Sequence, residues 1–230
     1  CTVTITGGEI SAAGGDFAAG IGGGVTDNST NAAAGAGGTV SISGGRVAAT
    51  GGECAAGIGG GAGGTVRGGE GAALTVAGGT VFATGGADGG PGIGGGVDEV
   101  SYGGTEPRVS GTSTFTGGSI RITGGYAAAA PSNGAARVWC VTVPELTPNA
   151  AIAVGSLGAY GVNDLFTDEA GKLYLWLPDN DYTFTAGGSG YTAAVNGADA
   201  TATLYLAAPV FAADGTALVF DGTTLSITIA

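Results

Sequence analysis

Hydrophobic and polar residues alternate with a period of two over short stretches of the chain, and pairs of glycines separate these stretches. Residues 2–6 read TVTIT, and residues 9–12, directly after Gly7-Gly8, read EISA. Strict alternation over four or five residues is typical of a β-strand with one buried face. A glycine pair suits a sharp corner because glycine adopts positive φ without a Cβ clash. The pattern therefore predicts short strands joined by tight corners.

This pattern recurs four times between residues 2 and 126. The segment ITGG at 5–8 returns as ISGG at 42–45, VAGG at 76–79 and FTGG at 115–118, with offsets of 37, 34 and 39 residues. Phrases centred on Ile21, Ile58 and Ile93 predict a third short strand in the first three copies, whereas the fourth copy lacks the phrase and continues into Tyr126. A degenerate last copy is expected of a terminal repeat.

Alignment of the copies predicts columns of inward-facing residues. In a stacked parallel arrangement equivalent residues lie about 4.8 Å apart, so that four copies share a core that one copy could not form. The alignment also pairs Glu9 with Arg46 on the surface and puts Phe82 on an outward position. The predicted columns are Val3, Val40, Leu74 and Ser113; Ile5, Ile42, Val76 and Phe115; Ile10, Val47, Val81 and Ile120; Ala12, Ala49, Ala83 and Ile122; and Ile21, Ile58 and Ile93.

The chain beyond residue 136 follows a different pattern. Short alternating segments are separated there by turn-forming residues, and about seven strands predict a small antiparallel β-sandwich over 137–230. Residues 173–177 and 182–186 flank the sequence Pro178–Asp181, and this arrangement predicts a hairpin. The tail at 208–230 either completes the sandwich or begins a further module.

Composition supports a division into two domains, 1–136 and 137–230. Of the 52 glycines, 42 lie in residues 1–139 and 10 in residues 140–230. The formal charges of these two stretches are −4 and −8, which sum to the net −12. Two domains also fit the length of 230 residues.

Composition also excludes several classes of function. The chain has no histidine, so histidine-based catalytic triads and histidine-ligated metals are excluded. A net charge of −12 disfavours nucleic acid, whose phosphates would be repelled. No stretch is long and apolar enough for a membrane span. The chain has no methionine, and Cys1 aligns with Gly38, so we expect a piece of a longer repeat array.

The repeats at 2–126 resemble the glycine-rich repeats of large secreted surface proteins of Gram-positive, mostly gut-dwelling bacteria. The shared features are the segments TVTITGG at 2–8 and AAGIGGG at 18–24 together with their later copies. This resemblance implies a right-handed parallel β-helix of about four coils and an extracellular, secreted or wall-attached location. It further implies contact with a host or bacterial surface glycan or protein, next to flanking domains of the same polypeptide.

Residues 167–191 resemble the signature of Cna-B-type and carboxypeptidase-regulatory-like, transthyretin-like β-sandwiches. Asn180-Asp181 stands where that signature has a glycine. Such modules are mostly stalks and spacers of surface proteins, which is what the resemblance implies here. Some of them carry a lysine–asparagine cross-link; Lys172 is the single lysine of the chain but falls in a turn. We therefore expect a solvated lysine.

Candidate binding residues are few. Phe82 on its outward position, and Tyr102 and Arg108 in an insertion between copies, are possible ligand contacts for a carbohydrate. Acidic clusters at 27–31, 98–99, 164–169 and 179–181 leave a calcium ion open as an alternative, but none has the EF-hand register, and no other cofactor is expected. Cys1, Cys54 and Cys140 lack metal-type spacing, and Cys54 aligns with Phe17 at an apolar position.

Three functions are compatible with this sequence. The favoured hypothesis is a non-catalytic adhesion or spacer module of a surface protein. The second is a carbohydrate-binding module that uses the insertion loops. The third is a polysaccharide lyase or hydrolase, because paired carboxylates on a β-helix can cleave glycosidic bonds. Acidic residues are scattered about one per copy, so no catalytic residue is predicted and the chain is not expected to be an enzyme.

Overall fold

The computed structural model describes residues 1–25, 32–63, 67–98, 106–158, 165–205, 218–220 and 225–227. Every regular element in these ranges is a β-strand, which confirms the predicted all-β class. None of these residues belongs to a helix that could cross a membrane.

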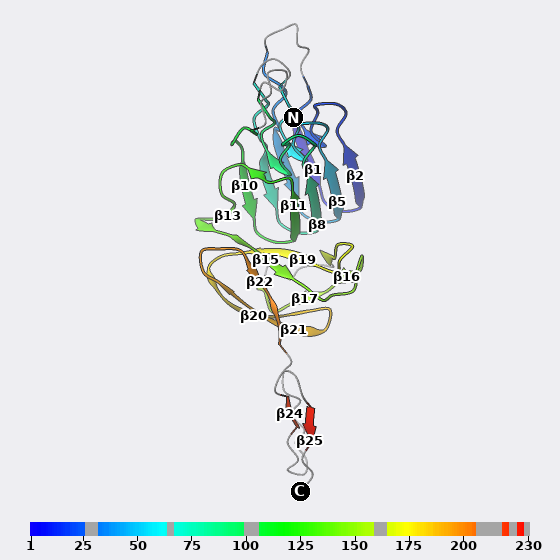
Figure 1. Cartoon of the computed structure of the whole chain (residues 1–230), viewed down its shortest axis with the longest axis vertical. Coiled ribbons are helices and arrows are strands. Elements are labelled where there is room, and N and C mark those ends of the chain that lie inside the picture. The colour runs from blue at the N-terminus through cyan, green and yellow to red at the C-terminus, as the bar shows by residue number, and fades with distance from the viewer. Residues whose placement is uncertain are drawn as a thin grey trace.

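The first part of the chain forms three parallel sheets, and each copy of the repeat contributes one strand to each sheet (Figure 1). The first sheet contains β1 (Thr2–Ile5), β4 (Thr39–Ile42), β7 (Ala73–Val76) and β10 (Thr112–Phe115); the second contains β2 (Glu9–Ala13), β5 (Arg46–Thr50), β8 (Thr80–Thr84) and β11 (Ser119–Thr123); the third contains β3 (Ile21–Gly22), β6 (Ile58–Gly59), β9 (Ile93–Gly94) and β12 (Tyr126–Ala127).

Strand pairing confirms the predicted columns. Ile5 lies opposite Ile42, Ile42 opposite Val76, and Val76 opposite Phe115. The remaining columns are paired in the same order, and their members from the second copy onward are almost all buried in one hydrophobic cluster. The fourth copy also has a third strand, which the pattern did not predict, and Tyr126 there continues the isoleucine column.

The glycines of the third sheet allow the copies to approach closely. Gly22, Gly59 and Gly94 have φ between +136° and +145°, a region that residues with a Cβ rarely adopt. A Cβ on each would strike the backbone carbonyl of the residue stacked beside it in the next copy. Backbone packing therefore requires the glycine that directly follows the isoleucine in each GIGGG phrase.

A small hairpin ends the first sheet. β13 (Ser132–Asn133) pairs in parallel with β10, and β14 (Ala136–Arg137) returns antiparallel to β13. The next strand, β15 (Trp139–Val143), belongs to a different sheet.

The second part of the chain has two main sheets that share one buried hydrophobic cluster. Most of its strand pairs are antiparallel, and β15 with β22 is a parallel pair. One main sheet has the order β19 (Leu173–Leu177), β15, β22 (Ala200–Thr201), and the other has the order β17 (Val154–Gly155), β20 (Asn180–Ala186), β21 (Ser189–Val195), β23 (Thr203–Tyr205); β16 (Ala151–Ile152) pairs with β18 (Leu165–Phe166), and β24 (Leu218–Phe220) pairs with β25 (Leu225–Ile227).

The predicted hairpin between residues 173–177 and 182–186 is wrong. β19 and β20 lie in different sheets, so Pro178 and Asp179 connect the two layers and Asn180 already belongs to β20. β20 pairs instead with β21 around Gly187-Gly188, whose φ values of 57° and 83° match a type I′ turn. Turn-forming residues such as Pro178 and Asp179 also occur where the chain crosses from one sheet to another. The pair Gly187-Gly188 is the stronger indication of a hairpin.

Replacement of Gly59 tests the close packing of the copies. We expect Gly59→Ala to lower the free energy of unfolding by about 3 kcal/mol, because the alanine combines an unfavourable φ with a backbone clash. Gly24→Ala is the matched control, since a Cβ at Gly24 meets no atom within 4 Å. Urea unfolding of both variants measures the difference. Equal stabilities would contradict the requirement for glycine at position 59.

Candidate functional site

The two parts of the chain meet where β19 packs against β11. Along β19 the leucines are buried in the core of the second part, while Tyr174 and Trp176 alternate with them and contact the first part. The indole nitrogen of Trp176 donates to the carbonyl of Ile120 at 2.9 Å. Its ring meets Phe115 edge-on, with centroids 5.2 Å apart. The last copy of the repeat is thus covered by the sheet that follows it.

Buried hydroxyl groups of the first part accept hydrogen bonds across this junction. The backbone N–H of Phe166 donates to Thr80 Oγ1 at 2.7 Å, and that of Tyr174 donates to Ser119 Oγ at 3.0 Å. Thr80 and Ser119 are paired at the start of neighbouring strands and are both fully covered. Because a buried N–H without a partner is costly, these hydroxyls fix how the second part docks.

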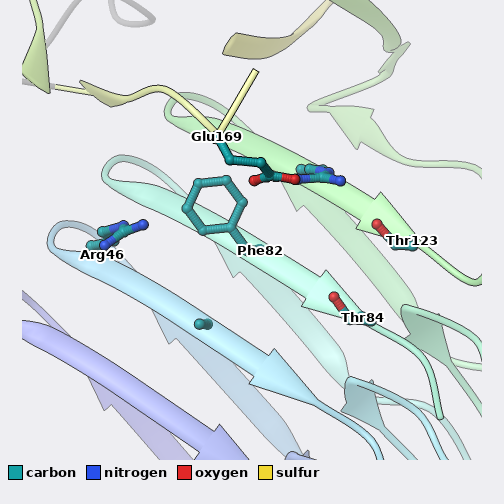
Figure 2. A pocket seen from close by; sticks show the side chains of 7 residues that line it. Arg46, Phe82, Thr84, Thr123 and Glu169 are labelled. Atoms are coloured by element: carbon teal, nitrogen blue, oxygen red, sulfur yellow. Dashed lines mark hydrogen bonds and ion pairs between the residues drawn. The ribbon is translucent and has the colours of Figure 1, made fainter. Parts of the chain in front are cut away.

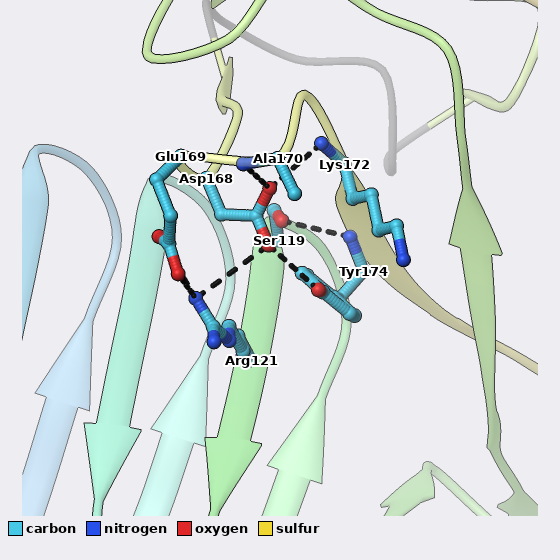
Figure 3. Close-up of polar contacts among 7 residues, drawn as sticks. All are labelled: Ser119, Arg121, Asp168, Glu169, Ala170, Lys172 and Tyr174. Atoms are coloured by element: carbon cyan, nitrogen blue, oxygen red, sulfur yellow. Dashed lines mark hydrogen bonds and ion pairs between the residues drawn. The ribbon is translucent and has the colours of Figure 1, made fainter.

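Asp168 organises the turn between β18 and β19 (Figure 3). Its Oδ1 accepts from the backbone N–H groups of Ala170 and Lys172, both at 2.9 Å, and its Oδ2 accepts from the Tyr174 hydroxyl at 2.7 Å. Arg121 of β11 lies 3.5 Å from Asp168 Oδ2 and 2.8 Å from Glu169 Oε1. This turn is therefore tied to the outer face of the first part.

These contacts shift the pKa values of the groups that share them. Burial raises the pKa of Asp168, but the hydrogen bonds from Tyr174, Lys172 and Ala170 and the charge of Arg121 together hold it below its usual value. The hydrogen bond from Arg121 lowers the pKa of Glu169. Burial, followed by the hydrogen bond to Asp168, raises the pKa of Tyr174 to about 12. At neutral pH both carboxyl groups are ionised and the phenol is protonated.

A groove of about 390 Å³ opens next to this turn on the outer face of the second sheet (Figure 2). Strands β5, β8 and β11 supply its floor, and the turn that follows β18 supplies one wall. We call it the Phe82 groove; its lining residues are Arg46, Ala48, Phe82, Thr84, Arg121, Thr123 and Glu169.

Arg46 occupies one side of the Phe82 ring. Its guanidinium carbon lies 5.4 Å from the ring centroid of Phe82 and 5.9 Å from that of Phe166, within the range of a cation–π contact. Arg46 also forms the predicted ion pair with Glu9, at 2.9 Å. Figure 2 shows the Phe82 ring standing between Arg46 and Glu169.

Of the three predicted contact residues, the structure places only Phe82 in this groove. Arg108 lies outside the lining and forms an ion pair with Glu70 of the preceding copy. Tyr102 falls outside the described residues. Alignment of the copies also places Arg121 level with Phe82, and the strand register pairs these two residues. Glu169, named above only as a candidate calcium ligand, was not predicted to lie near Phe82; it is far from Phe82 along the chain and reaches the groove because the second part docks there.

Several of the candidate calcium ligands that the structure describes are engaged in other contacts. Asp98 Oδ1 accepts from the N–H of Gly68 at 2.6 Å, and Asp179 Oδ1 accepts from the N–H of Gly197 at 2.7 Å. Within the described ranges no three acidic or cysteine side chains gather as a metal site would require. The candidates at 27–31, Glu99 and Asp164 fall outside those ranges.

A second cavity, of about 410 Å³, lies between the last copy and the sheet that covers it. Cys140, Tyr126 and Trp176 are among its lining residues. Burial raises the pKa of the Cys140 thiol to about 12, so the thiolate that a nucleophile needs is absent at neutral pH. All three cysteines of the chain are free, and Cys54 is buried beside Phe17, at the apolar position predicted for it.

No protein-family model matches this chain, and no curated protein or solved structure is significantly similar to it.

Replacement of Asp168 tests whether this carboxylate holds the junction. We expect Asp168→Asn to lower the free energy of unfolding by about 2 kcal/mol at pH 7, since one buried acceptor is lost beside Arg121. Because the folded-state pKa lies below the usual 3.8, the wild-type advantage is complete well above pH 4 and disappears as the pH falls through the folded-state pKa. Urea unfolding from pH 7 to pH 2 measures this difference, and a constant difference would contradict the role.

Proposed function

We propose that this chain is a non-catalytic module of a secreted or cell-surface bacterial protein, which serves as a stiff spacer and carries an adhesive surface. The observation that carries the proposal is the junction at Trp176, where one part of the chain completes the core of the other. Adjacent domains normally move relative to one another unless their interface is large and hydrophobic. A module that transmits position or force needs such an interface.

In this proposal the first part, 1–136, is a right-handed parallel β-helix, and the second, 137–230, is a β-sandwich of the Cna-B or transthyretin-like kind. The in-register order of the three sheets supports the first assignment, because each copy visits all three sheets in the same sequence. The shared cluster of the two later sheets supports the second. The tail at 208–230 lies largely outside the described residues.

The chemistry of the ionisable groups supports a non-catalytic role. A general acid that cleaves a glycosidic bond needs a raised carboxyl pKa, whereas the pKa values of Asp168 and Glu169 are lowered. Desolvation raises the pKa values of the Cys54 and Cys140 thiols. With no histidine in the chain, the usual bases for activating a nucleophile are also missing.

The partners we propose are a glycan or protein on a host or bacterial surface and flanking domains of the same polypeptide. The net charge of −12 disfavours a nucleic acid. Carbohydrate binding is the second candidate function, and the Phe82 groove favours it.

Removal of the Trp176 side chain tests the stiff junction. We expect Trp176→Ala to lower the free energy of unfolding by about 3–5 kcal/mol and to separate a single unfolding transition into two, because the core of the first part is then opened at its end. Trp176→Phe keeps a ring against Phe115 but loses the hydrogen bond to Ile120, so its loss should be smaller. Calorimetry and limited proteolysis measure both effects.

Two outcomes would contradict the proposal. Unchanged unfolding of Trp176→Ala would mean that the two parts are not coupled through this side chain. Release of reducing sugar from pectin or host glycans by the purified chain would overturn the non-catalytic role.

A further inference from the structure

We infer that the Phe82 groove is a binding site for an uncharged sugar. The inference deepens the adhesive role proposed above and rests on it for the class of ligand. It is carried by three features of the groove: a partly exposed aromatic ring, polar groups of both donor and acceptor type around it, and the pairing of its charges.

The ring of Phe82 provides a surface for a sugar. Phe82 lies on the outward face of a sheet and is partly exposed. Its neighbours in the same row are Ala48 and Arg121. The face of an aromatic ring is electron-rich and attracts positively polarised groups, including the C–H bonds of a pyranose. Ala48 is small and leaves the space beside the ring open, which the groove volume of about 390 Å³ reflects.

The polar groups around the ring match a ligand that both donates and accepts hydrogen bonds. Arg46 and Arg121 carry donors only, Glu169 carries acceptors only, and the hydroxyls of Thr84 and Thr123 can act as either. The hydroxyl groups of a sugar both donate and accept, so a sugar can form hydrogen bonds with the arginines, the glutamate and the threonines at once. A hydrocarbon ligand would cover the Thr84 and Thr123 hydroxyls and part of each guanidinium without offering them hydrogen bonds, at a cost.

The charges of the groove favour an uncharged ligand over an acidic one. Arg46 is paired with Glu9 at 2.9 Å, and Arg121 is paired with Glu169 at 2.8 Å and lies 3.5 Å from Asp168. Each guanidinium therefore already has a carboxylate partner. A uronate or sulfate would have to displace one of these carboxylates while approaching a chain of net charge −12.

The groove is held in shape before any ligand arrives. The Arg46 guanidinium lies against both Phe82 and Phe166, and Arg121 fixes Glu169 with two contacts of 2.8 and 3.0 Å. Preorganised groups lose little entropy when a ligand binds. The parallel strands below add a rigid floor.

A glycan array tests the site directly. The probes are linear oligosaccharides of glucose, mannose and galactose, with uronate oligosaccharides of equal length as the acidic set. We expect the wild-type chain to bind members of the uncharged set and none of the acidic set. Phe82→Ala should weaken binding about 10-fold and Phe82→Trp should retain it, as loss and replacement of a stacking ring require. Tyr205→Ala, an exposed aromatic on β23, is the matched control and should leave binding unchanged.

Glu169→Gln separates the two ligand classes. It keeps the shape of the side chain but removes the charge that pairs with Arg121, so binding of an uncharged sugar should weaken while affinity for uronates should rise. Binding of the acidic set alone by the wild-type chain would overturn the assignment of an uncharged ligand. Absence of binding to every probe, or full binding by Phe82→Ala, would overturn the site itself. Neither result would affect the junction experiment on Trp176, so failure of the groove and failure of the stiff module are distinguishable.

Discussion

The structure of the first part depends on how closely one copy of the repeat lies against the next. Backbone rests on backbone at Gly22, Gly59 and Gly94, where a Cβ would enter the carbonyl of the neighbouring copy. In the fourth copy Ala127 takes this position, and there the restriction is lifted because β12 is the edge strand of its sheet. A glycine is therefore needed at this position only in a copy that has the next copy stacked against it.

Close stacking fixes the strand register, and the register in turn fixes what the outer surface displays. Insertions of different length separate the copies, yet each row of side chains stays aligned across the sheet. Phe82 is therefore held on the outer face between Ala48 and Arg121 of the neighbouring copies. The same stacking leaves the last copy with an open apolar end, and the aromatic pair of Phe115 and Trp176 closes it.

The sequence alone predicts the features that depend on equivalent positions in the repeats. The buried columns, the pair of Glu9 and Arg46, and the outward position of Phe82 follow from alignment of the copies. Features that join distant parts were missed. Nothing near β19 in the sequence indicates that it pairs with β15 and not with β20, or that Glu169 reaches Phe82. The one available signal was the alternation of Tyr174 and Trp176 with leucines, which is typical of a strand covered on both faces.

The junction at Trp176 and the Phe82 groove both depend on how the second part docks on the repeats. Arg46, Phe82 and Arg121 come from the repeats, whereas Phe166 and Glu169 come from the turn region that Thr80, Ser119 and Asp168 hold in place. Without docking, Arg121 would lose its carboxylate partners and Arg46 one of its two aromatic contacts. Arg46 would keep its pair with Glu9, but Arg121 would be an unpaired cation near the phenyl ring, which suits an acidic ligand better than an uncharged one. The docked second part therefore sets the charge of the groove as well as its shape, and the stiff module and the sugar site that we propose require the same contacts.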